Sequence, residues 1–536
     1  MGAPGPITRT AAALLAGTIG VLVPGTAPLP AAAQSISPDD GGYYKEPPPV
    51  DLGLLPQDTG QPDQNYAQKT GCVERDLDNN VVLKNKPWGQ QFLRLDDVHQ
   101  LMNSTVGSAG KDANGNPIRV AVIDTGVTAT HPFFEGRVTG GGDYVQTKPA
   151  GPGLEDCDGH GTEVAGIIAA DTPDNIGFTG MAPDAQIVSI RQSSQAYEPD
   201  DSATETTPDT GGEPGEGDPA DGEGGEGEGG EGDGQAQPNA LRAPDAGEAT
   251  APGQNGRTQD QEGSAGNLST LAQAVVNATN QGVQVMNLSI NNCRAADGTI
   301  TPGEQALQAA VRNAVDRNVV VVTAAGNTGD SCEQNTGDPN TPQTIVTPPW
   351  FADDVLSVAA IDENGSVADF SVRGPWVSVA APGTKIISLD PAQGSGGLAN
   401  LTIENGESQP IRGTSFAAPY VAGLAALVRA KFPDLTARQV MNRITSTAQH
   451  PAAPGGRDNF VGHGVIDPMA ALTATVPEEE GESSAAAVAL PSDLPPANNR
   501  DWTPVIVALA GSGGALAALI IALFVVHTIR RNRRPA

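Results

Sequence analysis

The stretch around Ser415 constrains the fold more than any other, because it joins a glycine turn directly to an apolar helix. Residues 413–419 read GTSFAAP, and apolar residues continue with helical spacing to Val428. A serine at such a junction lies at a helix N-terminus, where free N–H groups and the helix dipole favour developing negative charge. Taken alone, the stretch would be an ordinary Ser/Thr helix cap. Two motifs upstream favour a different interpretation.

Each upstream motif places a polar side chain beside a predicted strand or helix. Residues 120–126 read VAVIDTG, and the apolar run predicts a buried parallel strand with Asp124 at its carboxyl end. Open α/β sheets place their sites at that end. Residues 158–162 read DGHGT and put His160 between two glycines, immediately before an apolar helix. Without its partners, Asp124 would be a common turn residue.

Together the motifs D-T-G, G-H-G-T and G-T-S-x-A-x-P resemble the subtilase family of serine proteases, which has the same chain order Asp, His, Ser. The resemblance implies that Ser415 is the nucleophile and His160 its general base. It implies that Asp124 fixes the imidazole tautomer and stabilises the imidazolium. Residues 318–327 predict a buried strand that ends in Gly-Asn. By the same resemblance, Asn327 supplies the oxyanion-hole side chain beside the Ser415 backbone N–H.

The resemblance also locates a substrate pocket, although the sequence departs from the family pattern there. In subtilases the strand matching residues 283–290 ends in S-x-G-G and lines the pocket for the residue before the scissile bond. Here residues 289–292 read SINN, so Ser289 and Ile290 hold the expected positions but the glycines are missing. The pocket shape, and with it the cleavage specificity, therefore does not transfer from the family. The opposite wall is expected from three residues: Ala324, Ala325 and Gly326.

The two ends of the chain have the composition of export and anchoring segments. Residues 1–33 predict a secretory signal with an A-x-A pattern before a cleavage site after Ala33, and a retained N-terminal anchor is the alternative. The 22 residues from 505 to 526 carry no charge. As a helix they would span about 33 Å, enough to cross a bilayer core. Arginines in the basic tail, residues 528–536, place the C-terminus of the predicted span (505–527) in the cytoplasm and the catalytic domain outside.

Three polar segments separate or interrupt these parts. Residues 34–87 are rich in proline and lack the strand and helix pattern of the inhibitory propeptide that many subtilases carry, so an extended N-terminal arm is predicted. The predicted catalytic domain, 88–476, contains an acidic insertion at 193–266 with 18 Asp and Glu against 2 Arg. This composition predicts disorder, and a tolerated solvated loop is favoured over a partner-binding one. An acidic, proline-rich linker follows at 477–503.

The cysteine pattern fits an exported chain. The even number predicts two disulfides rather than four free thiols, and three pairings can be drawn for Cys72, Cys157, Cys293 and Cys332. We favour Cys72 with Cys157, which would pin the arm beside His160, and Cys293 with Cys332. The net charge of −33 argues against nucleic-acid binding. Subtilases often bind calcium, but no carboxylate cluster here has a spacing that predicts a site, and we predict no metal and no cofactor.

The order of these parts resembles that of the mycosins, the membrane-anchored subtilases of actinobacterial type VII secretion. Residues 87–90 (PWGQ), 122–127 (VIDTGV) and 131–134 (HPFF) are also similar to that subgroup. The resemblance implies an α/β fold with a mostly parallel, helix-flanked sheet. It also implies a partner in the secretion membrane complex and cleavage of exported proteins. The alternative is a structural component of that complex with a masked or dispensable active site. The intact set of Asp124, His160, Asn327 and Ser415 favours the protease.

Overall fold

The computed structural model describes residues 42–73, 84–147, 151–200, 257–258, 264–329, 332–338, 341–404, 407–480 and 503–532. It divides into two units, Met1–Val476 and Pro477–Ala536, which are described separately. The predicted signal peptide, most of the acidic insertion, most of the linker and the end of the basic tail lie outside the described residues.

The larger unit is built around one seven-stranded sheet in the order β12-β11-β9-β7-β2-β4-β3. Every neighbouring pair of these strands is parallel. Most of the strands are apolar and buried along their length, as expected for a parallel sheet covered on both faces. Their bounds are β2 (Arg119–Asp124), β3 (Val138–Asp143), β4 (Gln186–Arg191), β7 (Val285–Leu288), β9 (Val320–Ala324), β11 (Leu356–Ile361) and β12 (Val379–Pro382).

The strand order reverses at β2. The chain adds β3 and β4 on one side of β2, and then β7, β9, β11 and β12 on the other. In open α/β sheets, ligands bind beyond the carboxyl ends of the strands at such a reversal. Asp124 is the last residue of β2 and therefore lies at that point.

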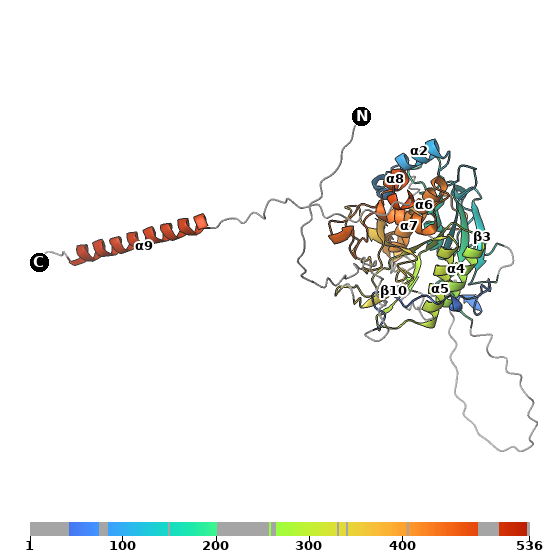
Figure 1. The fold of residues 1–536 in the computed structure, drawn as a ribbon, viewed down its shortest axis with the longest axis horizontal. Coiled ribbons are helices and arrows are strands. Elements are labelled where there is room, and N and C mark those ends of the chain that lie inside the picture. Colours follow the sequence, from blue (N-terminus) through green and yellow to red (C-terminus); the bar gives the residue numbers. More distant parts are fainter. Residues whose placement is uncertain are drawn as a thin grey trace, which may run out of the picture. The chain divides into compact units, whose positions relative to one another are not determined.

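The sheet is flanked by helices, of which α6 (Thr414–Lys431) is buried along almost its whole length and packs along β7, β9, β11 and β12. α3 (His160–Ala169) packs against α6 and β2. α4 (Leu268–Asn280) and α5 (Pro302–Asp316) lie side by side, as Figure 1 shows. The remaining helices of this unit are α1 (Trp88–Phe92), α2 (Leu95–Thr105), α7 (Ala437–Ser446), α8 (Pro468–Thr473) and the short η2 (Leu52–Leu54), η3 (Pro132–Phe134) and η5 (Pro454–Gly456).

The single strand expected at residues 283–290 is in fact two strands. β7 ends at Leu288, and after Ser289 the chain continues as β8 (Ile290–Ala295) in a separate small sheet. There β8 lies between β10 (Thr344–Thr347), which is antiparallel to it, and β6 (Arg257–Thr258), which is parallel to it. The remaining short strands are β13 (Ser388–Leu389), β14 (Leu398–Ala399), β15 (Leu401–Glu404) and β16 (Glu407–Pro410).

The prediction of disorder over the whole of 193–266 is wrong at both ends of that segment. Residues 193–200 are ordered, and β5 (Tyr197–Pro199) pairs antiparallel with β1 (Tyr66–Gln68) of the N-terminal arm. Ala196, Tyr197 and Ala265 form a small buried cluster with Val145 and Cys157. These few apolar side chains pack on one another and on Val145 and Cys157, which explains the order at the two ends of the segment.

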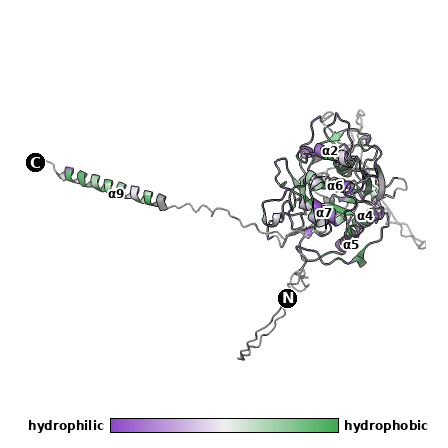
Figure 2. Cartoon of the chain, turned by 45° about the horizontal axis from the view of Figure 1, so that its top comes forward, coloured by the Kyte–Doolittle hydropathy of each residue, from purple (hydrophilic) through white to green (hydrophobic). Residues whose placement is uncertain are grey.

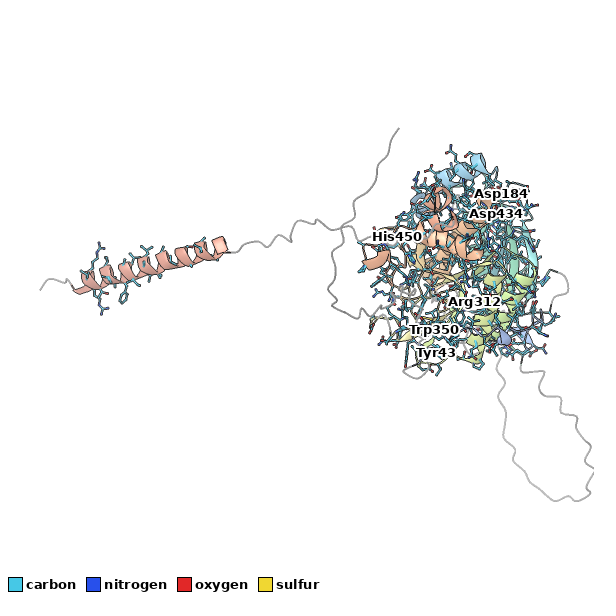
Figure 3. The ribbon with its side chains drawn as sticks, in the orientation of Figure 1. Tyr43, Asp184, Arg312, Trp350, Asp434 and His450 are labelled. Atoms are coloured by element: carbon cyan, nitrogen blue, oxygen red, sulfur yellow. A yellow bond between two sulfur atoms is a disulfide. The ribbon has the colours of Figure 1, made fainter. Side chains whose placement is uncertain are left out.

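The described part of the N-terminal arm, residues 42–73 and 84–87, bonds to several distant parts of the larger unit. Near its start, the Trp350 indole N–H donates to the Tyr44 carbonyl at 3.0 Å, and Figure 3 shows Tyr43 close to Trp350. Further along, the Asp58 carboxylate accepts from the Tyr144 hydroxyl at 2.6 Å and from the Asn277 amide at 2.8 Å. The arm therefore binds the catalytic unit through specific hydrogen bonds as well as through the disulfide described below.

The smaller unit contains η6 (Pro477–Glu480) and α9 (Thr503–Asn532). Within the described residues, one helix is long and apolar enough to cross a membrane, over Val507–Arg531 with a mean hydropathy of 2.4. Figure 2 shows hydrophobic colouring along most of α9. The helix extends a few residues beyond the predicted span, 505–527, at both ends.

Candidate active site

Three side chains from distant parts of the sequence meet in one hydrogen-bonded chain at the carboxyl end of the sheet. The His160 Nδ1 lies 2.7 Å from Asp124 Oδ1, and His160 Nε2 lies 2.9 Å from Ser415 Oγ. Because a carboxylate accepts only, Nδ1 carries the proton and Nε2 is left to accept from the serine hydroxyl. All three side chains are buried, with Asp124 at 0 % exposure. The arrangement can remove a proton from Ser415 and hold the resulting imidazolium against a carboxylate.

Asp124 is held by the turn that follows β2. Its Oδ1 also accepts from the Thr125 backbone N–H at 2.8 Å. Gly126 has φ of +102°, and a Cβ atom there would lie 1.9 Å from the Glu155 carbonyl oxygen. Glycine is therefore required at this position, because the turn after β2 passes very close to the backbone at Glu155.

His160 is the first residue of α3, and its imidazole packs on Phe416, the third residue of α6, with ring centroids 5.0 Å apart. Gly161 fits tightly against the Asp124 loop, since a Cβ there would lie 2.1 Å from the Gly126 carbonyl oxygen. The two glycines beside His160 thus let the helix start approach the end of β2 closely enough for the imidazole to reach Asp124.

Ser415 is the second residue of α6, so the helical pattern gives its N–H no acceptor in the preceding turn. Pro419 lies four residues on and has no N–H to donate to the Ser415 carbonyl. The Ser289 hydroxyl donates to that carbonyl instead, at 2.8 Å. This bond holds Ser289, which lies between β7 and β8, against the start of α6.

Asn327 follows β9 and is oriented by Thr414. Its Oδ1 accepts from the Thr414 backbone N–H at 2.9 Å and lies 3.0 Å from the Thr414 hydroxyl. With Oδ1 committed to Thr414, the amide NH₂ group is the donor that remains for another oxygen. A Cβ placed on Gly413 would lie 3.0 Å from Ser415 Oγ and 3.6 Å from Asn327 Nδ2, so this amide and the nucleophile border the same small space.

Of the residues expected to line the substrate pocket, Ser289 and Gly326 contact the start of α6. Ser289 contacts the Ser415 carbonyl, and Ile290 begins β8. Ala324 ends β9, and the Gly326 N–H donates to the Thr414 hydroxyl at 3.2 Å. Ala325 lies between them and is fully buried. Their role in substrate binding stays a prediction.

Both disulfides that the sequence analysis favoured are present. Cys72 bonds Cys157 and joins the arm to the segment just before α3, and the Val73 N–H donates to the Cys157 carbonyl at 2.8 Å. Cys293 bonds Cys332 and joins β8 to the loop after Asn327. Each disulfide therefore lies close in sequence to one half of the site.

The sequence analysis missed Asp156, whose carboxylate accepts hydrogen bonds from both the Asp124 loop and the first turn of α3. No clear signal was available in the sequence, because a capping side chain normally belongs to the N-cap residue, which is Gly159 here, and Asp156 lies three residues before it. Its neighbours in the sequence, Cys157 and the DGHGT motif, have more obvious roles. Among the described residues, no group of three or more His, Cys, Asp or Glu side chains is arranged to hold a metal ion.

Comparison with known proteins agrees with this geometry. The model of the subtilase family matches residues 115–464. Mycosin-1 of Mycolicibacterium smegmatis is 37% identical over 502 residues, which cover 91% of this chain and 95% of that protein. Mycosin-1 of Mycobacterium tuberculosis is 40% identical over 443 residues, which cover 80% and 83% of the two chains.

Solved structures give the same result. The structure of the serine protease MycP1, described as an essential component of the type VII (ESX-1) secretion system, has a TM-score of 0.62 and 37% identity and covers 80% of this chain and 99% of its own. A chain of the intact ESX-5 inner membrane complex has a TM-score of 0.61 and 35% identity, with 90% and 100% covered. The chain is thus a serine protease of the subtilase family, and among the subtilases it belongs to the mycosins.

Proposed function

We propose that this chain is a membrane-anchored serine endopeptidase that cleaves exported proteins on the outer side of the membrane. The observation that carries the proposal is the continuous hydrogen-bonded chain from Asp124 through His160 to Ser415. A protein that served only as a scaffold would need no such chain.

The geometry gives each group one task in peptide-bond cleavage. Ser415 Oγ attacks the carbonyl carbon of the substrate while His160 Nε2 takes the hydroxyl proton. The carbonyl oxygen becomes negative and accepts from the Asn327 amide and the Ser415 N–H. The imidazolium, stabilised by Asp124, gives its proton to the departing amine. Water then repeats the sequence on the acyl-enzyme and frees Ser415.

The same proposal places the enzyme at a membrane. α9 provides a span of sufficient length, and basic residues are concentrated at its C-terminal end, which favours a cytoplasmic tail. The catalytic unit would then face outward, where its two disulfides are stable. Labelling of an engineered cysteine in the tail by a membrane-impermeant reagent, only after permeabilisation, would support this orientation. Labelling in intact cells would reverse it.

We propose the membrane complex of a type VII secretion system as the partner. Support comes from the similarity to chains of the ESX-5 inner membrane complex and of its periplasmic assembly. Affinity purification through a tag on the C-terminal tail should recover the other subunits of such a complex. Recovery of the protease alone under conditions that preserve the complex would contradict the assignment.

The test of catalysis is covalent labelling of the full-length chain in detergent by a fluorophosphonate, beside Ser415→Ala. We expect labelling of the wild-type protein and none of the variant. Since the triad supplies nucleophile and base without a metal, we also expect EDTA to leave labelling unchanged. A folded wild-type protein that resists labelling would contradict the proposal.

A second candidate function is that of a stabilising component whose active site is masked. One observation favours it: one edge of β8 pairs with β10, and its other edge is already paired with β6 at the residues that directly follow Ser289. That edge is therefore not open to a substrate. Extended peptides bind proteins by pairing with such an edge. If this role dominates, cells that carry Ser415→Ala will assemble a normal secretion complex, and cells that lack the protein will not.

We propose that export removes residues 1–33 and that the arm, from residue 34 onward, stays with the mature enzyme. The arm's hydrogen bonds and its disulfide to Cys157 support retention. N-terminal sequencing of the mature protein should begin near Gln34. A single sequence that starts near Pro117, with none that starts near Gln34, would show that the arm is removed.

A further inference from the structure

Asp156 lies next to the triad without belonging to it. We propose that Asp156 is a positioning residue for proteolysis, which ties the loop after Asp124 to the first turn of the His160 helix and so sets the contact between these two side chains. The inference rests on the proposed protease function and adds a residue to it.

The Asp156 carboxylate accepts four hydrogen bonds. Oδ1 accepts from the Thr125 hydroxyl and from the Gly159 N–H, each at 2.7 Å. Oδ2 accepts from the Thr162 N–H at 2.8 Å and from the Thr162 hydroxyl at 2.7 Å. Thr125 directly follows Asp124, while Gly159 and Thr162 lie on either side of His160. A single carboxylate thus binds the chain on both sides of the Asp124–His160 contact.

The protons of these bonds can be assigned. The Thr125 hydroxyl oxygen accepts from the Gly161 N–H at 3.0 Å, and the Thr162 hydroxyl oxygen accepts from the Thr128 N–H at 2.9 Å. Each hydroxyl is therefore free to donate to Asp156. All four partners are donors, which is the environment of an ionised carboxylate.

Burial of the carboxylate raises the pKa of Asp156, and the nearby Asp158 raises it further, while hydrogen bonds from Thr162 and Thr125 oppose the rise. The negative charge is thus held in place by donors that themselves belong to the two catalytic loops. If the donors moved apart, the carboxylate would lose the hydrogen bonds that compensate for its burial.

The path from Asp156 to the triad is short on both sides. Thr125 binds Asp156 through its hydroxyl and Asp124 Oδ1 through its N–H at 2.8 Å. On the helix side, Gly159 binds Asp156 and His160 is the next residue. A Cβ on Gly161 would lie only 3.2 Å from Asp124 Cβ, so the two loops have little room to shift without losing these bonds.

The test compares Asp156→Asn with the wild type as full-length proteins in detergent. The amide keeps the shape but turns one oxygen into a donor, so it cannot accept from both Thr125 and Thr162. We expect the rate constant of the covalent step with a fluorophosphonate to fall by about 10- to 100-fold, the size of effect known for small misplacements of catalytic groups. KM for a peptide substrate should change less than about twofold, because the inference concerns the catalytic step and not binding.

Threonine variants keep the test valid if Asp156→Asn does not fold. Thr125→Val and Thr162→Val each remove one donor to Asp156, and we expect each to slow the covalent step by about tenfold. Thr125→Ser and Thr162→Ser keep the hydroxyl and should stay within about threefold of wild type. Thr279→Val is the matched control, since it removes a buried hydroxyl of α4 that donates to the Val275 carbonyl. It should leave the rate unchanged.

The outcomes separate the inference from the proposed function. If the wild type labels and Asp156→Asn labels at the same rate with an unchanged melting temperature, the positioning role is overturned and the protease function stands. The role is also overturned if the serine variants lose as much of the rate constant of the covalent step as the valine variants do. A rise in KM as large as the fall in that rate constant would overturn it as well. If the wild type itself does not label, the proposed function fails first.

Discussion

The helices that carry His160 and Ser415 begin in similar ways but are capped by groups of different charge. α3 starts after Gly159 and α6 after Gly413, and neither glycine can supply a capping side chain. The start of α3 donates to the Asp156 carboxylate. The start of α6 donates to the neutral amide oxygen of Asn327.

The difference agrees with the charge that each helix start would meet during proteolysis. His160 becomes positive, so a carboxylate nearby is favourable. Beside Ser415 an oxyanion forms, and a carboxylate there would repel it. An amide can accept from the helix through its oxygen and still donate to the oxyanion through its nitrogen. The charge of each cap therefore fits the reaction as well as the helix.

The largest effect is expected from Asn327→Asp. This variant removes the difference in charge between the two caps, because both helix starts would then meet a carboxylate. Truncation of the corresponding oxyanion-hole asparagine in subtilisin costs about 10²–10³ in kcat. We expect Asn327→Ala to lose about that much, and Asn327→Asp to lose at least as much because repulsion is added. The measurement is kcat for a peptide substrate.

Asn280→Asp controls for the change in charge alone. Asn280 accepts from Arg317 on the surface, and its replacement should leave kcat unchanged. An Asn327→Asp enzyme within tenfold of wild type would show that Asn327 does not bind the oxyanion.

A smaller effect is expected from the residue that orients Asn327. Thr414→Val removes the hydroxyl that lies 3.0 Å from Asn327 Oδ1 and accepts from the Gly326 N–H. Loss of one such bond predicts a fall in kcat of about tenfold. Thr414→Ser keeps the hydroxyl and should retain most of the wild-type kcat. Equal losses for the two variants would show that the hydroxyl alone does not preserve kcat, and the orienting role of its hydrogen bonds would be contradicted.

Variants without one disulfide will show whether the starts of α3 and α6 are held mainly by covalent links or by hydrogen bonds. Removing either pair as a double serine variant should lower the free energy of unfolding by about 2–4 kcal/mol. At a temperature where both variants are folded, we expect fluorophosphonate labelling to slow by less than about threefold. If loss of Cys72–Cys157 slowed labelling as much as Asp156→Asn, the arm rather than the carboxylate would be the support of α3.

The smallest effect concerns His131, a buried histidine outside the triad. Burial lowers the pKa of His131, although the hydrogen bond between Nε2 and the Gly397 carbonyl oxygen, at 3.1 Å, and the charge of Asp390 both oppose this. As pH falls below about 6.5, the unfolded chain takes up a proton that the folded chain does not, so stability is lost at up to about 1.4 kcal/mol per pH unit.

His131→Gln should therefore flatten the dependence of the melting temperature on pH between 7 and 5.5. It should do so without changing the rate of labelling at neutral pH. An unchanged pH dependence would show that His131 is protonated equally in both states.

The sequence was sufficient to predict the parts of the fold that depend on local pattern. The apolar run that was expected as a strand ending at Asp124 forms β2, and the helix expected from the start of GTSFAAP forms α6. Apolar runs between glycine and proline turns leave few alternatives for such segments. The meeting of Asp124, His160 and Ser415 came instead from the family resemblance, since no periodicity relates residues so far apart.

What the sequence did not predict depends on contacts between distant residues. The break after Leu288 lies at Ser289, which bonds to Ser415, 126 residues away. Asp156 is one of 63 acidic residues, and its partner Thr125 lies 31 positions upstream. The ordered start of the acidic insertion pairs with the arm, and its ordered end pairs with that start through Ala265 and Ser194. None of these contacts can be predicted from the residues that neighbour each position in the sequence.

Because Cys72 is bonded to Cys157, cleavage of the backbone between the arm and α1 would not release the arm. If a protease severed the link between the arm and α1, the arm would remain attached through sulfur. The enzyme would then exist as two chains that migrate together without reductant and separate with it. Release of the arm would require two independent events, a hydrolysis and a reduction, and neither alone would suffice.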